Sequence, residues 1–139
     1  MSEEKNLAVL QRALACFSSP SQHEEYFNLY DPNVVLHGYA GVEPGLENVK
    51  QFYAGLWAAF PDAGLTVENM FAHQDKVVCQ FVMTGTHQGD FMGVPPTGKP
   101  IALPGITILR FENQKCVERW SQADFLGVLM QIGAIPSPG

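Results

Sequence analysis

His87 stands where an alternating apolar run ends, at a position that suits acid/base chemistry. The run KVVCQFVMTGTHQ, residues 76–88, alternates in polarity as a strand with one buried face does. The predicted inner face holds His87 together with four apolar side chains: Val77, Cys79, Phe81 and Met83. An imidazole there could exchange protons with a bound molecule near neutral pH. The simpler interpretation is a buried histidine that is hydrogen-bonded to a backbone carbonyl or a carboxylate.

The segment that follows His87 is a stiff loop with apolar side chains. It reads GTHQGDFMGVPPTGKP, residues 85–100, and the stretch PPTG at 95–98 combines a restricted backbone with a glycine that tolerates positive φ. A preorganised apolar loop lowers the ordering cost of ligand binding. We therefore predict that the loop rims a cavity and offers Phe91 and Met92 to the bound molecule.

Asp124 is the carboxylate that could work with His87. It precedes the apolar run FLGVLMQIG, so one interpretation is an N-cap of a short helix, which is typically worth about 1 kcal/mol. The other is that Asp124 reaches the cavity and acts as an acid/base with His87. His37, beside Gly38, has a structural interpretation and a second one as a group that orients polar parts of a ligand.

Apolar periodicity predicts the elements that must position these side chains. Helical spacing predicts an amphipathic helix over 3–17 and another over 46–57, and Ser21 with Glu24 suggests a capping box for a short helix between them. VVLHG suits a strand. From residue 64 the period changes to two, which predicts four successive strands: GLTVENMFAH, KVVCQFVMTGTHQ, IALPGITILRF and KCVERWSQ. This order predicts one α+β domain over 1–139, with helices on one face of a curved sheet.

Composition excludes several classes of function. The net charge is −6 and the basic residues are dispersed, so nucleic acid is not an expected partner. The three cysteines are widely spaced, without the spacing of a zinc site or a disulfide framework. No apolar run approaches the roughly 20 residues of a membrane helix. We expect a cytoplasmic protein without metal or cofactor, since phosphate-loop and dinucleotide motifs are also missing from the sequence.

The strand IALPGITILRF is apolar on both predicted faces. One face can cover the core, but the other needs a partner, and the sheet of a second subunit would supply it. The sequence therefore predicts a homodimer formed through the outer face of the sheet.

Four stretches resemble a known family in their order along the chain: HG at 37–38, AAFPD at 58–62, GTHQGDFMGVPPTGK at 85–99 and DFLGVLMQIG at 124–133. Together they resemble the SnoaL-like polyketide cyclases, of the superfamily that includes nuclear transport factor 2 and ketosteroid isomerase. The resemblance covers nearly the whole chain. It implies a cone-shaped α+β barrel, in which a curved, mostly antiparallel sheet wraps around a long N-terminal helix and a deep apolar cavity, with two further helices and a short C-terminal one.

The resemblance also implies a chemistry, an intramolecular aldol ring closure without metal or cofactor. One buried carboxylate draws a proton from a carbon that flanking carbonyls make acidic, and burial makes such a carboxylate a stronger base. The aspartate that does this work in the family corresponds to Ser121 here, and its supporting histidine and glutamine to Thr107 and Gly105. A serine without a neighbouring base cannot abstract such a proton, so the ring-closing machinery does not carry over residue by residue.

We therefore expect a hydrophobic, carbonyl-bearing small molecule in an apolar cavity and cofactor-independent acid/base catalysis by Asp124 and His87, as an isomerisation or a cyclase-like ring closure. The predicted substrate-binding residues are His37, Thr107, Ser121, Arg119, Phe91, Met92, Trp120 and Tyr30. Two alternatives stay open. One is a binding protein without catalysis. The other is an epoxide-opening hydrolase, which would need an inward Arg119 close to an aspartate.

Overall fold

The computed structural model describes residues 2–39 and 41–136. Its elements, in chain order, are α1 (Ser2–Phe17), η1 (Pro20–Gln22), α2 (His23–Tyr26), η2 (Phe27–Leu29), β1 (Tyr30–His37), α3 (Leu46–Ala59), β2 (Gly64–His73), β3 (Lys76–Thr86), β4 (Pro100–Glu112), β5 (Lys115–Ala123) and α4 (Phe125–Gln131). Within this described part, no helix combines the length and apolar character needed to cross a membrane.

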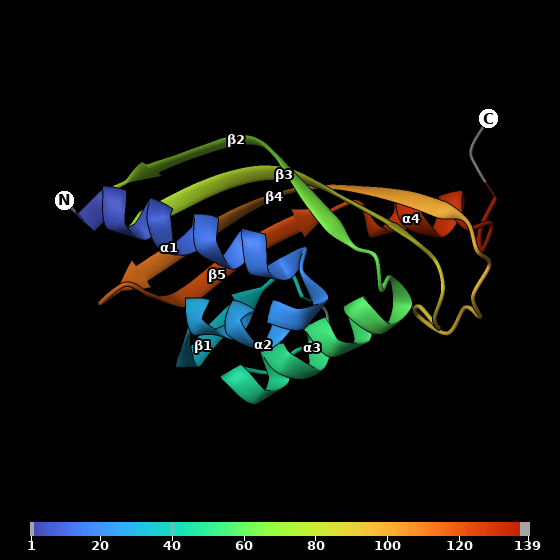
Figure 1. The fold of residues 1–139 in the computed structure, drawn as a ribbon, viewed down its shortest axis with the longest axis horizontal. Helices are drawn as coiled ribbons and strands as arrows, with labels where there is room; N and C mark the ends of the chain where they lie inside the picture. The colour runs from blue at the N-terminus through green and yellow to red at the C-terminus, as the bar shows by residue number, and fades with distance from the viewer. Residues whose placement is uncertain (1, 40, 137–139) are drawn as a thin grey trace.

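The five strands form one curved sheet in the order β1-β5-β4-β3-β2. Strand β1 pairs with β5 in parallel, and the other three pairings are antiparallel. Figure 1 shows the long strands arching over α1 and α3, which lie on the same side of the sheet. The predicted α+β fold with a mostly antiparallel sheet is confirmed.

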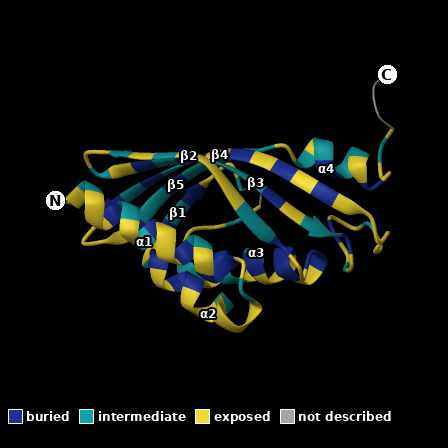
Figure 2. Cartoon of the chain, turned by 45° about the horizontal axis from the view of Figure 1, so that its top comes forward, coloured by how far each residue is buried: buried dark blue, intermediate teal, exposed yellow. Residues whose placement is uncertain are grey.

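Strand β4 separates the two faces of the sheet most clearly. Its burial alternates residue by residue, as Figure 2 shows, because successive side chains of a strand point to opposite faces. Leu103 and Leu109 are buried on the inner face, whereas Ile106 on the outer face is 54% exposed. The inner face is thus covered by the helices of the same chain, and the outer face remains open for the predicted second subunit.

The region between α1 and β1 differs from the prediction. Ser21 lies within η1, and the N-cap of α2 is Gln22, which makes no side-chain capping bond. The predicted capping box is therefore wrong. Pro20, at the start of η1, suits the first turn of a helix, so the chain begins to coil before Ser21 can act as a cap.

The loop between β3 and β4 is fixed to the end of α3. The backbone N–H groups of Gln88 and Gly89 both donate to the carbonyl of Ala59, at 2.9 and 3.1 Å. A Cβ on Gly89 would collide with the carbonyl of Ala58, so only glycine allows this close approach. Gly98 has a φ of 72°, which confirms the predicted left-handed turn position. The first arm of the loop is thus fixed to α3, and the second arm is joined to the first by a hydrogen bond from the N–H of Gly98 to the carbonyl of His87 at 2.8 Å.

Candidate functional site

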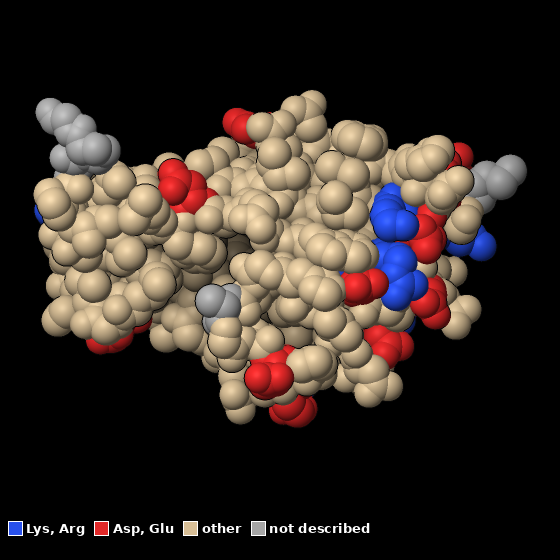
Figure 3. All heavy atoms as spheres, turned by 180° about the vertical axis from the view of Figure 1, so that it is seen from behind, with Lys and Arg blue, Asp and Glu red and all other residues tan. Residues whose placement is uncertain are grey.

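A cavity of about 490 Å³ lies between the inner face of the sheet and helices α1 and α3. This is within the range of small-molecule sites, roughly 300–1,000 Å³. Most of its wall is apolar, with α1, α3 and β3 contributing Leu10, Leu14, Phe17, Phe52, Leu56, Cys79, Phe81 and Met83. The loop after β3 adds Phe91 and Met92 to the wall. Figure 3 shows that the molecule is hollowed near the middle of one face, and that the lysine and arginine side chains of this face lie mainly toward one end, next to acidic ones.

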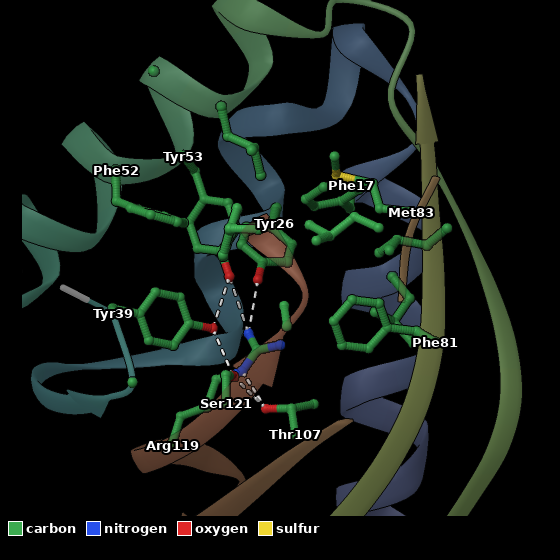
Figure 4. Close-up of a pocket in the computed structure, with 18 of the residues that line it drawn as sticks. Phe17, Tyr26, Tyr39, Phe52, Tyr53, Phe81, Met83, Thr107, Arg119 and Ser121 are labelled. Atoms are coloured by element: carbon green, nitrogen blue, oxygen red, sulfur yellow. Dashed lines mark hydrogen bonds between the residues drawn. The ribbon is translucent and has the colours of Figure 1, made fainter. Parts of the chain in front are cut away.

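Arg119 brings a cation into this apolar space. Because β5 alternates, Arg119 points inward with Ser121, and its side chain is only 6% exposed. Its Nε donates to Thr107 Oγ1 at 2.9 Å. Its Nη1 donates to the hydroxyls of Tyr30, Tyr26 and Tyr53 at 2.6, 3.1 and 3.2 Å. Figure 4 shows Tyr26 and Tyr53 converging on the guanidinium. Strands and helices from distant parts of the chain thus cooperate to hold one arginine.

The partners of Arg119 are neutral. Burial raises the pKa of all four tyrosines around it, Tyr26, Tyr30, Tyr39 and Tyr53, so their hydroxyls stay protonated near neutral pH. Among the described residues, no carboxylate lies within ion-pair distance of Arg119. Burial opposes its charge, but the surrounding tyrosines raise the pKa of the guanidinium more, and it stays charged.

A chain of hydroxyls continues from Arg119 across the cavity wall. Thr107 Oγ1 lies 2.7 Å from Ser121 Oγ, which in turn lies 3.0 Å from the hydroxyl of Tyr39. Thr107 also donates to the backbone carbonyl of Trp120 at 3.0 Å. The hydrogen-bonded group around Arg119 therefore consists of one cation and several hydroxyls, and none of the described carboxylates belongs to it.

Most of the predicted substrate-binding residues lie at the cavity. Thr107, Ser121, Arg119, Phe91 and Met92 line it. Tyr30 stands behind Arg119 and contacts its Nη1 rather than the open space. The inward direction of Arg119 follows from the strand alternation, but the aspartate that a hydrolase would need beside it is not found among the described residues.

The predicted acid/base pair is not assembled at the cavity. His87 is fully buried, its Nδ1 accepts from the backbone N–H of Thr97 at 3.2 Å, and it is outside the cavity wall. Strand β3 ends at Thr86, so the alternation that would aim His87 at the cavity stops one residue early. Asp124 is exposed and accepts from Gly127 N at 2.8 Å, as the helix cap of α4. The geometry favours the structural interpretation of both residues.

His37 and Trp120 lie on the opposite side of the sheet from the cavity. His37 Nε2 is 2.7 Å from Glu118 Oε2, and its ring stacks on Trp120 with centroids 5.3 Å apart. Their placement follows from the same alternation that turns Arg119 inward, because its neighbours in β5 must then point outward. Neither residue lines the cavity, so the expectation of direct ligand contact by these two is corrected.

Sequence reasoning missed Asp90 and the tyrosine cluster. Asp90 is the one carboxylate in the described wall of the cavity, where it is exposed and accepts from Gly93 N at 3.1 Å. Its position directly before Phe91, in a loop predicted to rim a cavity, was the available signal. Tyr39 and Tyr53 gave none, because a tyrosine in a helical stripe or after a strand is usually core.

Other groups offer little further chemistry. Cys79 lines the cavity, but burial raises its pKa, so it remains a thiol. Within residues 2–39 and 41–136, no group of three or more histidine, cysteine or acidic side chains could hold a metal ion.

The sequence model of one family, described as SnoaL-like polyketide cyclase, matches residues 8–132. The chain belongs to this family. No curated protein sequence matches this SnoaL-like chain. Position 105, where the resemblance places a glutamine in the cyclases, is a glycine here, and the ring of Phe81 occupies the space that a side chain would need.

Solved structures of similar proteins agree with the SnoaL-like assignment. AclR from Streptomyces galilaeus, a candidate hydroxylase, is 27% identical with a TM-score of 0.85, over 99% of this chain and 86% of that one. A candidate SnoaL-like polyketide cyclase from Jannaschia sp. CCS1 is 28% identical, with a TM-score of 0.83 over 96% and 95%. IdmH from Streptomyces antibioticus, a candidate polyketide cyclase, is 30% identical, with a TM-score of 0.78 over 92% and 98%. The SnoaL-like cone fold therefore extends over nearly the whole chain.

Proposed function

We propose that this SnoaL-like protein binds a hydrophobic, carbonyl-bearing small molecule in its cavity and catalyses a cofactor-independent proton transfer, as an isomerisation or a ring closure. The observation that carries the proposal is the division of the cavity wall. Nearly all of it is apolar, while its hydrogen-bond donors gather around Arg119 on one side. Such a wall orients a flat apolar molecule by placing its carbonyl oxygen at the donors.

The donors also suit the reaction class. Removal of a proton next to a carbonyl moves negative charge onto the carbonyl oxygen, and a fixed cation near that oxygen stabilises the transition state. Arg119 is held by Thr107 and by tyrosine hydroxyls before any ligand arrives, so little reorganisation is needed when the charge develops.

We propose Asp90 as the base, in place of Asp124 and His87. It is the carboxylate in the described cavity wall, and it stands beside Phe91 at the loop. An aspartate can serve as the base in this chemistry when the oxygen of the substrate is well stabilised, as the aspartate base of ketosteroid isomerase does. Asp90 would remove the proton while Arg119 holds the oxygen.

Deuterium exchange tests this proposal without knowledge of the natural substrate. The α-protons of α-tetralone, a bicyclic aromatic ketone, are followed by NMR in deuterated buffer with wild-type protein, Asp90→Asn and the matched control Asp124→Asn. We expect catalysed exchange in the wild type, a loss of about 100-fold or more in Asp90→Asn, and a rate within about twofold of wild type in Asp124→Asn. The reverse order of the two variants would contradict the choice of Asp90.

A binding protein without catalysis is the second candidate. It is favoured by the residues at the family's catalytic positions, where Ser121, Thr107 and Gly105 supply no base. The same experiment separates the two functions. Saturable binding of the ketone, with exchange no faster than in buffer, would support the binding protein and reject the enzyme.

A further inference from the structure

One terminal nitrogen of Arg119 has no hydrogen-bond partner among the residues that the structure describes. The guanidinium has five N–H groups, and its Nε and Nη1 are bonded to Thr107 and to the tyrosine hydroxyls. Among the described residues, none accepts a hydrogen bond from Nη2. In Figure 4 this nitrogen points away from Tyr26 and Tyr53, on the side of Phe81. Two N–H donors of a buried cation therefore remain available.

The free nitrogen reaches the cavity rather than being enclosed by side chains. Arg119 belongs to the cavity wall, although only 6% of its surface is exposed. The described side-chain nitrogens that are both fully enclosed and without a partner are Trp57 Nε1 and His87 Nε2, and Arg119 Nη2 is not one of them. Nη2 thus has contact with space that a ligand atom can enter.

The charge of Arg119 also has no counter-ion within residues 2–39 and 41–136. An isolated buried charge is unfavourable because it loses its hydration, and hydroxyl dipoles compensate for only part of this loss. The guanidinium carbon lies 6.0 Å from the ring centroid of Tyr39, which adds a weak cation–π contact but no negative charge. A negatively charged oxygen beside Nη2 would satisfy the donors and balance the charge together.

The number of free nitrogens limits the shape of the anion. Carboxylates pair best with arginine through two parallel hydrogen bonds from two nitrogens. Here Nη2 has no free neighbouring nitrogen with which to form such a pair, because Nε already donates to Thr107 and Nη1 already donates to the tyrosine hydroxyls. Nη2 alone can bind one oxygen atom, and Phe17 and Phe81 nearby offer aromatic surface to the atoms behind it.

We infer that Arg119 Nη2 is a binding site for a single oxyanion conjugated to a flat apolar skeleton, a phenolate or an enolate, in preference to a neutral phenol or a carboxylate. The natural ligand would then be a flat phenolic or enolisable molecule that the protein holds in its ionised form. This inference rests on the proposed cavity function and adds the charge state of the ligand. It concerns binding only, so it can fail or succeed independently of any turnover.

The ionisation of bound para-nitrophenol tests the inference, because its phenolate absorbs visible light and its phenol does not. An apolar cavity by itself would raise the pKa of the bound phenol, whereas a cation at the oxygen lowers it. In the wild type we expect the pKa of bound para-nitrophenol to be lower than in buffer by about one unit or more, and the phenolate to bind about tenfold tighter than the phenol. A raised pKa, or no detectable binding to the wild type, would overturn the inference.

Variants assign the effect to Arg119. Arg119→Met should raise the pKa of the bound phenol above its value in buffer and weaken phenolate binding by about tenfold or more, while Arg119→Lys should keep part of the shift. Arg12→Met makes the same change at an exposed site on α1 and should behave as the wild type. Para-nitroanisole, which cannot ionise, should bind all four proteins within about twofold, which shows that the cavity is intact. Phenolate binding that survives in Arg119→Met with the same pKa shift would reject Arg119 as the site.

A carboxylate arm tests the geometry of the site. Para-nitrobenzoate carries the same ring and a full negative charge, but it needs two donors side by side. We expect it to bind wild-type protein more weakly than the phenolate. Tighter binding of the benzoate would contradict the single-oxygen site, although it would leave the proposed cavity function intact.

Discussion

The substitution Ser121→Asp would place a carboxylate beside the unpaired charge of Arg119. The hydroxyl of Thr107 lies between the two side chains, 2.7 Å from Ser121 Oγ and 2.9 Å from Arg119 Nε. The hydroxyl of Tyr39 lies 3.0 Å from Ser121 Oγ, so it could donate to the new carboxylate. Because Ser121 lines the cavity, the larger side chain has room to extend.

The expected effect on the free energy of unfolding is a gain. Two unit charges about 5 Å apart attract by about 3 kcal/mol at an effective dielectric constant of about 20. Desolvation of the half-buried carboxylate offsets part of this, which leaves a net stabilisation of about 1–2 kcal/mol. For a chain of this length, that corresponds to a rise in Tm of roughly 3–8 °C. The same carboxylate would neutralise Arg119 and weaken the binding of para-nitrophenolate by about tenfold or more.

Thermal unfolding followed by circular dichroism measures this effect, with Ser121→Asn as the control of equal shape and no charge. The cation lowers the pKa of the new aspartate in the folded state below its unfolded value of about 3.9. The added stability should therefore be complete above that pH and disappear as the pH falls through the folded value. If Ser121→Asp were no more stable than Ser121→Asn at pH 7, the description of Arg119 as a cation without a counter-ion would be refuted.

Two further predictions concern the contact between Asp62 and Thr86 at the end of β3 and the outer face of the sheet. Asp62 accepts hydrogen bonds from the hydroxyl and the backbone N–H of Thr86, both at 2.7 Å, and these bonds lower the pKa of Asp62. Their contribution to the stability of the fold is therefore present above the pKa that Asp62 has in the unfolded chain. It is lost as the pH falls through the pKa of Asp62 in the folded protein. Tm measured between pH 7 and pH 2 should show wild type and Asp62→Asn converging at the acid end, and a constant difference would contradict this. On the outer face, Phe71 and Ile106 are 56% and 54% exposed. The predicted homodimer buries this face, so the charge introduced by Ile106→Lys should dissociate it. Sedimentation of the wild type as a monomer at micromolar concentration would reject the dimer.

Local patterns in the sequence were sufficient for most of the fold. The alternation in GLTVENMFAH predicts β2 with the bounds that the structure has, because side-chain direction along a strand depends only on the local backbone. The acidic cap at Asp124 and the left-handed glycine at Gly98 are confirmed for the same reason, since each depends on a few neighbouring residues. The capping box at Ser21 failed because a competing local signal, the turn that starts at Pro20, came first.

The sequence by itself determined the family and the order of the elements. Only the tertiary structure decided what surrounds Arg119. Tyr26, Tyr30 and Tyr53 come from three different elements, α2, β1 and α3, and no spacing along the chain relates them to Arg119. It also decided that His87 and Asp124 take structural positions outside the cavity wall, because a side chain beyond the end of a strand is directed by the contacts of the loop and the cap rather than by alternation.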